Sequence, residues 1–216
     1  MVLILYNMKL IAFDFDGVII NSLAAMEAAW SEISIIFPEA SNVDFTSYLQ
    51  FVGMPFPAIM QSLSLEGCMP NIQHQYFALT KKYQSLVHIY DGMKLVIDYC
   101  NSRQAFSTAL VTSKSQSRTY DLCDSLKLKF DLIVCPEDTL RGKPYPDPLL
   151  FANKKLLCAP SASLYIGDMI TDYSAAASAG WDFVYASWGY GNIPNNSSSL
   201  ITHSPSNLYS YLTTFK

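Results

Sequence analysis

The feature that most limits the fold is the alternation of short apolar runs with longer helical patterns from about residue 90 onward. The runs have the length and composition of buried β-strands, and they occupy residues 105–113, 130–135, 163–168 and 181–187, with an earlier one at 9–15. Strands of this kind separated by helices are typical of a parallel sheet covered on both faces. The sequence therefore predicts an α/β fold with a doubly wound, mainly parallel, Rossmann-like sheet, whose ligands bind beyond the carboxyl ends of the strands.

Residues 22–88 follow a different pattern, in which apolar residues recur at helical spacing between prolines and glycines. Because this segment comes directly after the first strand, we expect a small helical cap domain of residues 22–88 inserted into an α/β core domain of residues 1–21 and 89–216. Such an insertion lies above the carboxyl end of the sheet and could close over a ligand as a lid. Its turn Gly-Met-Pro-Phe-Pro, residues 53–57, could point into the site.

The composition limits the class of partner. The formal net charge is −4 and no run of Lys or Arg occurs, which argues against nucleic acid and against an anionic membrane surface. No segment reaches the 18 or so uninterrupted apolar residues of a spanning helix. We therefore expect a partner that is a small molecule, with the protein a monomer or a homodimer.

Five cysteines are scattered singly, without a Cys-x-x-Cys pair, at positions 68, 100, 123, 135 and 158. An odd, dispersed set indicates neither a disulfide framework nor a zinc site, so we expect reduced thiols and a cytoplasmic location. The first ten residues lack a basic region and a cleavage site, so no signal peptide is expected. Residues 1–7 either lengthen the first strand or precede a native start at Met8.

Polar side chains follow the predicted strands where each strand ends: Asp14 and Asp16, then Thr112, then Lys143, then Asp168 and Asp172. The carboxyl ends of parallel strands meet at one edge of a sheet, so we expect these side chains to converge. Several carboxylates beside a single lysine would repel one another unless a divalent cation neutralised them. Sites rich in carboxylate oxygen favour Mg²⁺.

Asp14 and Asp16 are two residues apart, a spacing that sends both side chains to the same side of a strand. Two carboxylates can divide the work of phosphoryl transfer, one attacking phosphorus and the other handling the proton of the alcohol or water. Lys143 and Thr112 would hold the negative phosphoryl oxygens. The spacing thus predicts phosphoryl-transfer chemistry.

Four separated segments resemble, in their order and intervals, the four motifs of the haloacid dehalogenase-like superfamily, in particular its phosphoglycolate phosphatase-like branch: FDFDGV, ALVTSK, GKPYPDP and YIGDMITD. The resemblance covers about residues 9–191, including the helical insert. The segment AGWDFVYASWGYG, residues 179–191, adds to it. The resemblance implies a Mg²⁺-dependent phosphatase for a small phosphate monoester, with phosphoglycolate the nearest family substrate.

The resemblance also implies a role for each site residue. Asp14 is expected to be the nucleophile that becomes an aspartyl phosphate, and Asp16 the general acid and base. The phosphoryl group is expected to be bound by Thr112, Ser113 and Lys143. Relatives that cleave carbon–halogen or carbon–phosphorus bonds differ at the second aspartate, so Asp16 favours phosphate ester chemistry.

The same resemblance implies three metal ligands: the Asp14 carboxylate, the Asp16 main-chain carbonyl and Asp168. Asp172 is expected to act through water or by orienting Lys143. A plain alternative stays open for Asp172, which could simply be an acid at the positive end of a helix dipole.

Two other functions stay open, a sugar-phosphate mutase of the same superfamily and a non-catalytic phosphate-binding or receiver-like module. A lid acid or histidine serving sugar hydroxyls would favour the mutase, and none is evident. Receivers need neither the helical insert nor a second acidic motif after the lysine. The group that binds the far end of the substrate is undefined, because the insert has no arginine and only Lys81 and Lys82. A second anionic group would need a cationic or amide cradle in the lid, which main-chain amides could supply.

Overall fold

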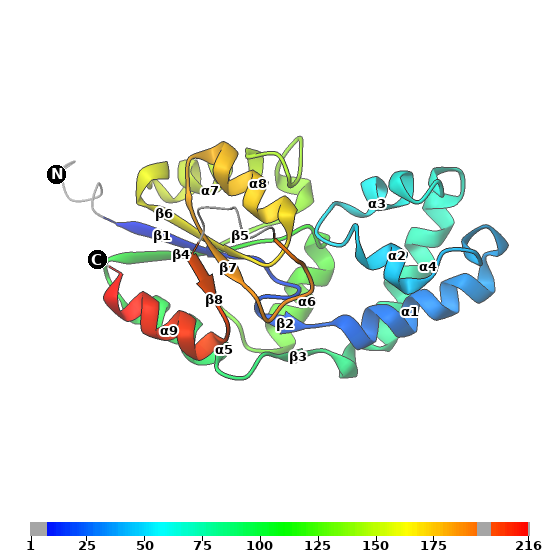
Figure 1. Ribbon diagram of the computed structural model, residues 1–216, viewed down its shortest axis with the longest axis horizontal. Coiled ribbons are helices and arrows are strands. Elements are labelled where there is room, and N and C mark those ends of the chain that lie inside the picture. Colours follow the sequence, from blue (N-terminus) through cyan, green and yellow to red (C-terminus); the bar gives the residue numbers. More distant parts are fainter. Residues whose placement is uncertain (1–7, 194–199, 216) are drawn as a thin grey trace.

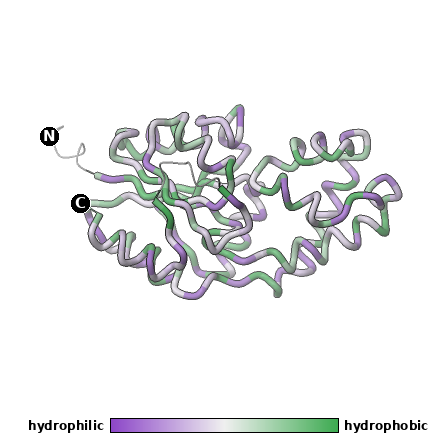
Figure 2. The backbone as a smooth tube through the Cα atoms, viewed as in Figure 1, coloured by the Kyte–Doolittle hydropathy of each residue, from purple (hydrophilic) through white to green (hydrophobic). Residues whose placement is uncertain are grey.

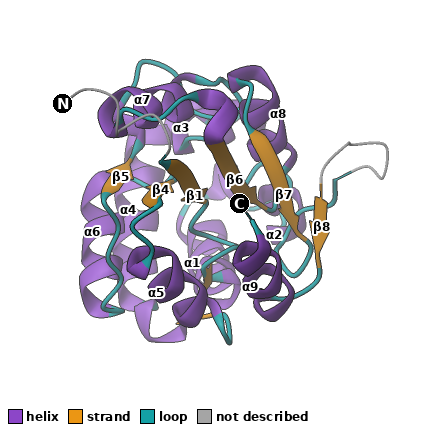
Figure 3. Ribbon diagram, turned by 90° about the vertical axis from the view of Figure 1, so that its left-hand side faces the viewer, coloured by secondary structure: helices purple, strands orange, loops and turns teal. Residues whose placement is uncertain are grey.

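A single six-stranded sheet forms the centre of the molecule in the computed structural model, which describes residues 8–193 and 200–215. Its strands are β1 (Lys9–Phe13), β4 (Phe106–Val111), β5 (Leu132–Val134), β6 (Ser163–Gly167), β7 (Asp182–Ala186) and β8 (Leu200–Thr202). The spatial order is β5-β4-β1-β6-β7-β8, and every neighbouring pair is parallel (Figure 3). The predicted fold class is therefore confirmed.

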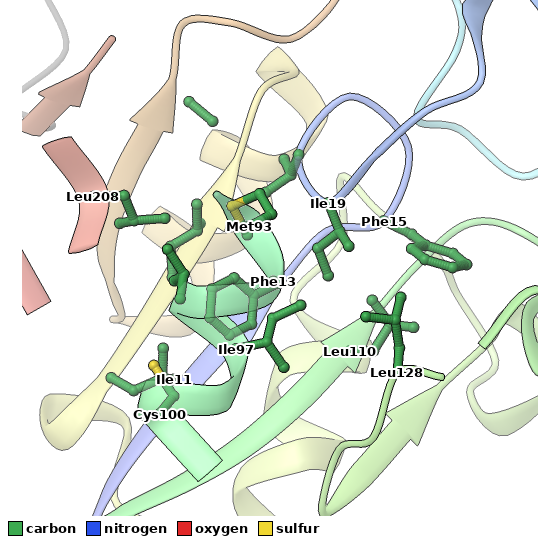
Figure 4. Packing of buried hydrophobic residues seen from close by; sticks show 14 of the residues in the cluster. Ile11, Phe13, Phe15, Ile19, Met93, Ile97, Cys100, Leu110, Leu128 and Leu208 are labelled. Carbon is green, nitrogen blue, oxygen red and sulfur yellow. The ribbon is translucent and has the colours of Figure 1, made fainter. Parts of the chain in front are cut away.

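β1 lies inside the sheet, and its side chains alternate between two hydrophobic cores. Ile11 and Phe13 pack on one face, where Figure 4 shows them beside residues of α5. Leu10 and Ala12 pack on the other face. The first face is covered by α5 (Met93–Ser102), α6 (Gln116–Ser125) and α9 (Pro205–Thr214), and the second by α7 (Asp147–Leu156) and α8 (Ile170–Ala179). Figure 2 shows hydrophobic and hydrophilic residues alternating along these helices, as one buried face requires.

The strands end earlier than the apolar runs suggested. The run at 105–113, for example, becomes a strand over Phe106–Val111. Of the polar residues that the sequence singled out, Asp14, Thr112, Lys143 and Asp168 lie outside the strands and helices, whereas Asp172 lies in the first turn of α8. β8 was not expected, because Leu200–Thr202 is too short to show a periodic pattern.

Residues 22–88, the helical unit, lie beyond the carboxyl ends of the strands (Figure 1). Their helices are α1 (Leu23–Ile36), α2 (Phe45–Leu49), α3 (Phe56–Ser62) and α4 (Met69–Lys82). The helical unit has its own core, in which the Trp30 ring stacks on Tyr48 with centroids 4.4 Å apart. The Tyr48 hydroxyl also donates a hydrogen bond to that of Tyr76 at 2.9 Å. The chain enters and leaves the unit through an antiparallel pair, β2 (Ile20–Asn21) and β3 (His88–Ile89).

Short single-turn 3₁₀ helices connect several of these elements: η2 (Pro38–Ala40), η3 (Glu66–Cys68), η4 (Gln84–Leu86), η5 (Pro136–Asp138) and η6 (Pro160–Ala162). All five cysteines are free thiols. Within residues 8–193 and 200–215, no helix is long and apolar enough to cross a membrane. Residues 1–7, which could lengthen the first strand, lie outside the described residues.

The two faces of α5 provide a test of the core. Ile97 is 1% exposed, whereas Leu95 on the same helix is 59% exposed. We expect Ile97→Ala to lower the free energy of unfolding by about 2–5 kcal/mol, because it leaves a cavity in a packed core. Leu95→Ala is the matched control and should change it by less than about 0.5 kcal/mol. Urea unfolding followed by circular dichroism measures both, and equal losses would contradict this packing.

Candidate active site

The loops after β1, β4 and β6 bring polar side chains together between the sheet and the helical unit. Asp14 follows β1, Thr112 follows β4 and Asp168 follows β6, and all three are buried. This convergence reflects the parallel order of the three adjacent strands, which places their carboxyl ends side by side. The carboxyl edge of the sheet is therefore the candidate active site.

Lys143 lies at the centre of this group. Its Nζ is 2.8 Å from Oδ1 of Asp14 and 2.6 Å from Oδ1 of Asp172, and it donates to the Tyr165 hydroxyl at 3.0 Å. Burial disfavours the charge on Lys143, but the carboxylates of Asp14 and Asp172 outweigh burial and raise the pKa of the amine above its usual value. Lys143 is therefore a buried ammonium ion shared between two carboxylates.

Asp172 is held through both of its carboxylate oxygens. Oδ1 accepts from Lys143, and Oδ2 accepts from the backbone N–H groups of Asp168 at 3.1 Å and Met169 at 3.0 Å. The last two contacts are those of an acid in the first turn of α8. Asp172 thus contacts both the start of α8 and Lys143.

Asp16 is paired with a second buried lysine that sequence reasoning missed. Its Oδ2 is 3.1 Å from Nζ of Lys114, and its Oδ1 accepts a hydrogen bond from the Ser22 hydroxyl. Burial opposes the charged carboxylate, but Lys114 and Ser22 lower the pKa of Asp16 overall. The expectation of a single lysine is therefore wrong. Lys114 stands two residues after Thr112, yet the sequence carries no mark of which way its side chain points.

Asp168 has one engaged and one free carboxylate oxygen. Oδ2 accepts from the backbone N–H of Tyr190 at 2.7 Å, whereas buried Oδ1 has no hydrogen-bond partner within the described part of the chain. Glycines make room for this carboxylate, since a Cβ on Gly189 would lie 2.3 Å from the Cβ of Asp168. Burial and the neighbouring carboxylates of Asp172 and Asp14 raise the pKa of Asp168 well above its ordinary value.

Three carboxylates, those of Asp14, Asp168 and Asp172, each offer an oxygen within 4.8 Å of the others. Because Lys143 and two backbone amides already engage Asp172, the less occupied donors are Asp14 and Asp168. Burial raises the pKa of Asp14 to about 7 despite the adjacent Lys143. The site therefore has less positive charge than its carboxylates need, and its oxygen donors fit a hard divalent cation.

The two hydroxyl residues after β4 have different surroundings. Oγ1 of Thr112 accepts from the backbone N–H of Lys114 at 3.1 Å, a local contact within the loop. Oγ of Ser113 donates to the Gly53 carbonyl in the helical unit at 2.6 Å. Gly53 has φ +100°, and a Cβ there would meet Oγ1 of Thr171 at 2.8 Å. Ser113 therefore joins the sheet edge to the turn at 53–57 as well as facing the site.

A cavity of about 60 Å³ lies over these residues. Asp14, Asp16, Thr112 and Ser113 form its floor, on the side of the sheet. The turn at 53–57 reaches it through Gly53, Met54 and Phe56, so this turn does point toward the site. The aromatic core of the helical unit completes the lining with Tyr48 and Tyr76.

Comparisons with known proteins identify the family and the fold of this chain. The sequence profile of the family described as haloacid dehalogenase-like hydrolase matches residues 11–186. A phosphoglycolate phosphatase from Xylella fastidiosa is 24% identical over 197 residues, which are 87% of this chain and 84% of the relative. A phosphorylated carbohydrates phosphatase from Thermotoga maritima is 23% identical, covering 82% of this chain and 84% of the relative. The crystal structure of a hydrolase from Pseudomonas syringae superposes with a TM-score of 0.84 at 23% identity, over 95% of this chain and 98% of that one, and shows the same fold.

The raised pKa of Asp14 leads to a test of the site's charge balance. The ordinary value is 3.8 and the folded value is about 7, so between these the folded state holds a proton that the unfolded state has lost. The contribution of Asp14 to stability is therefore full below pH 3.8 and is lost as the pH rises toward 7. With EDTA present, the free energy of unfolding of Asp14→Asn minus that of the parent should increase by a few kcal/mol, roughly, over this range.

Urea unfolding at about pH 4.5 and about pH 7.5 measures this difference. Asp98→Asn is the control, because Asp98 pairs with Lys94 on the surface of α5. Its difference from the parent should stay nearly constant with pH. A constant difference for Asp14→Asn as well would show that Asp14 ionises freely in the folded protein.

Proposed function

Because this chain belongs to the haloacid dehalogenase-like hydrolase family, we propose that it is a Mg²⁺-dependent phosphatase that hydrolyses a small phosphate monoester through an aspartyl-phosphate intermediate. The observation that carries the proposal is the buried Asp14, held by Lys143 at 2.8 Å beside a second carboxylate that has its own lysine. The names of the phosphatase relatives from Xylella fastidiosa and Thermotoga maritima support the reaction class. Phosphoglycolate, which the name of the Xylella fastidiosa relative contains, is the first candidate substrate.

Asp14 is the nucleophile in this proposal. Lys143 holds Oδ1 of Asp14, which leaves Oδ2 to attack phosphorus. Asp172 and Tyr165 fix the ammonium group in turn, so the attacking carboxylate is oriented before the substrate arrives. Thr112, Ser113 and Lys143 supply the groups that bind the phosphoryl oxygens.

Asp16 moves the proton. Its lowered pKa suits the base that takes a proton from water when the aspartyl phosphate is hydrolysed. The same proton can then pass to the leaving oxygen of the next substrate. Ser22 and Lys114 hold the two oxygens of Asp16, so this carboxylate is positioned separately from Asp14.

The metal position in this proposal comprises the Asp14 carboxylate, the Asp16 main-chain carbonyl and Asp168. Support comes from the free Oδ1 of Asp168 and from the raised pKa of Asp14, since both call for a further positive charge. When bound, Mg²⁺ would act as a Lewis acid that neutralises the nucleophile and the phosphoryl group. Asp172 orients Lys143 instead of binding the metal.

We further propose that residues 22–88 are a cap domain that closes over a core domain of residues 1–21 and 89–216. The separate aromatic core around Trp30 supports this division. The bond from Ser113 to the Gly53 carbonyl supports closure at the turn 53–57. The free thiols fit a cytoplasmic enzyme.

Substitution of the nucleophile tests the reaction. The parent should release inorganic phosphate in the presence of Mg²⁺ from at least one of phosphoglycolate, sugar phosphates, nucleotides and pyrophosphate, and Asp14→Asn should reduce the rate to background. Asp98→Asn, in the surface pair on α5, is the matched control and should retain the parent's rate. Absence of Mg²⁺-dependent release from the whole panel, or an active Asp14→Asn, would rule out the mechanism.

The Ser22 hydroxyl gives a second test, directed at Asp16. Ser22→Ala removes a hydrogen bond that lowers the pKa of Asp16, so this pKa should rise. The acidic limb of the pH profile of aspartyl-phosphate hydrolysis, the step in which Asp16 is the base, should then move to higher pH in a single-turnover measurement. Ser31→Ala is the control, because Ser31 lies on exposed α1 surface and bonds only to the Glu27 carbonyl. An unmoved limb would mean that Asp16 is not the group that loses the proton.

A further inference from the structure

A second and larger cavity adjoins the candidate active site. It has a volume of about 400 Å³ and lies between α1 and α4 of the helical unit and α6 of the core. Three side chains line both this cavity and the one over Asp14: Met26, Lys114 and Arg118. The two cavities therefore meet at a pair of cationic residues.

Arg118 is held by aromatic rings of the helical unit. Its guanidinium carbon lies 4.5 Å from the ring centroid of Phe77 and 5.9 Å from that of Tyr76. Stacking on rings uses the flat face of a guanidinium and leaves its N–H edges available for a planar or tetrahedral anion. Arg118 belongs to α6, so a core side chain reaches into the space under the helical unit.

Arg118 has no ion-pair partner of its own among the described residues, although its charge helps to lower the pKa of Asp16. Lys114 is paired with Asp16 at 3.1 Å, and Lys81 with Asp121 at 3.2 Å. No carboxylate of the described residues lies within 4 Å of the Arg118 guanidinium. A cation of this kind, oriented by rings and partly withdrawn from water, can give an anionic ligand a strong charge-assisted hydrogen bond.

We propose that Arg118, assisted by Lys114, binds a second anionic group on the substrate, either a carboxylate or a second phosphate. The substrate is then a phosphate ester whose leaving group carries negative charge. Its phosphoryl end occupies the cavity over Asp14, and its remaining atoms extend into the larger one. This inference rests on the proposed phosphatase function.

The arrangement differs from the one expected on the sequence. The sequence placed the cradle for a second anion, cationic or amide, in the lid, and the lid has no arginine. The structure instead provides the cation from α6 and the aromatic support from α4. Substrate selection by charge is thereby shared between the core and the helical unit.

A matched pair of substrates tests the proposal by turnover. Phosphoglycolate and 2-hydroxyethyl phosphate differ in the charge of leaving groups of similar length, and pyrophosphate adds the second-phosphate case. The parent should prefer phosphoglycolate or pyrophosphate to 2-hydroxyethyl phosphate in kcat/KM by at least about tenfold, and Arg118→Gln should lower this preference about ten- to a hundredfold. Arg118→Lys keeps the positive charge but loses the two parallel N–H donors of the guanidinium. Its substrate preference should lie between those of the parent and Arg118→Gln.

Arg103→Gln is the matched control, since Arg103 is an exposed arginine at the end of α5, and it should keep the parent's preference. Thermal unfolding confirms that each variant is folded. An unchanged preference in Arg118→Gln, or a parent that prefers neither anionic substrate, would overturn the proposal and leave the phosphatase function intact.

A binding measurement separates this inference from the reaction itself. Calorimetry in the presence of Mg²⁺ compares phosphonoacetate and methylenediphosphonate with ethylphosphonate, which has no second anionic group. The parent should bind at least one of the first two about tenfold more tightly, and Arg118→Gln should lose that advantage. The tighter of the two identifies the second group as carboxylate or phosphate. This result would support the second anion site even if the panel of esters showed no turnover. Equal binding of all three ligands by the parent would refute the site.

Discussion

The buried contact of Lys143 with Asp14 and Asp172 is the interaction on which the rest of the site depends. The ammonium group of Lys143 lies between two carboxylates that follow different strands and offsets their mutual repulsion. The two carboxylates in turn raise the pKa of Lys143 and keep it charged. Removing a partner from such a group leaves an uncompensated buried charge, which is strongly destabilising. The group therefore fixes how the loops after β1, β5 and β6 meet.

The two aspartates of FDFD differ because their surroundings differ. Asp14 shares its lysine with Asp172, and burial raises its pKa. Asp16 has Lys114 to itself together with the Ser22 hydroxyl, and its pKa is lowered. Carboxylates with divergent proton affinities can take different parts in one reaction. Two aspartates separated by a single residue are thus chemically distinct.

The sequence predicted the sheet well because buried parallel strands consist of apolar runs, and because polar residues at their carboxyl ends must share an edge. It missed β8, a three-residue strand whose pairing depends on its neighbour β7. It also missed Lys114 and Arg118. Nothing in the run TSKSQSR shows which of its cations turn inward, since this depends on how α6 meets the rings of α4. No sequence pattern marks Tyr190 as a site residue, although it contacts both Asp168 and Ser22.

Tyr190 contacts both the loop after β6 and the start of α1. Its backbone N–H donates to Asp168, and its hydroxyl accepts from the backbone N–H of Ser22, the residue at the start of α1. Ser22 in turn donates its hydroxyl to Asp16. Rotation of α1 about its first residue would displace the donor that lowers the proton affinity of Asp16. The start of α1 and the charge of Asp16 are therefore coupled through a single hydroxyl group.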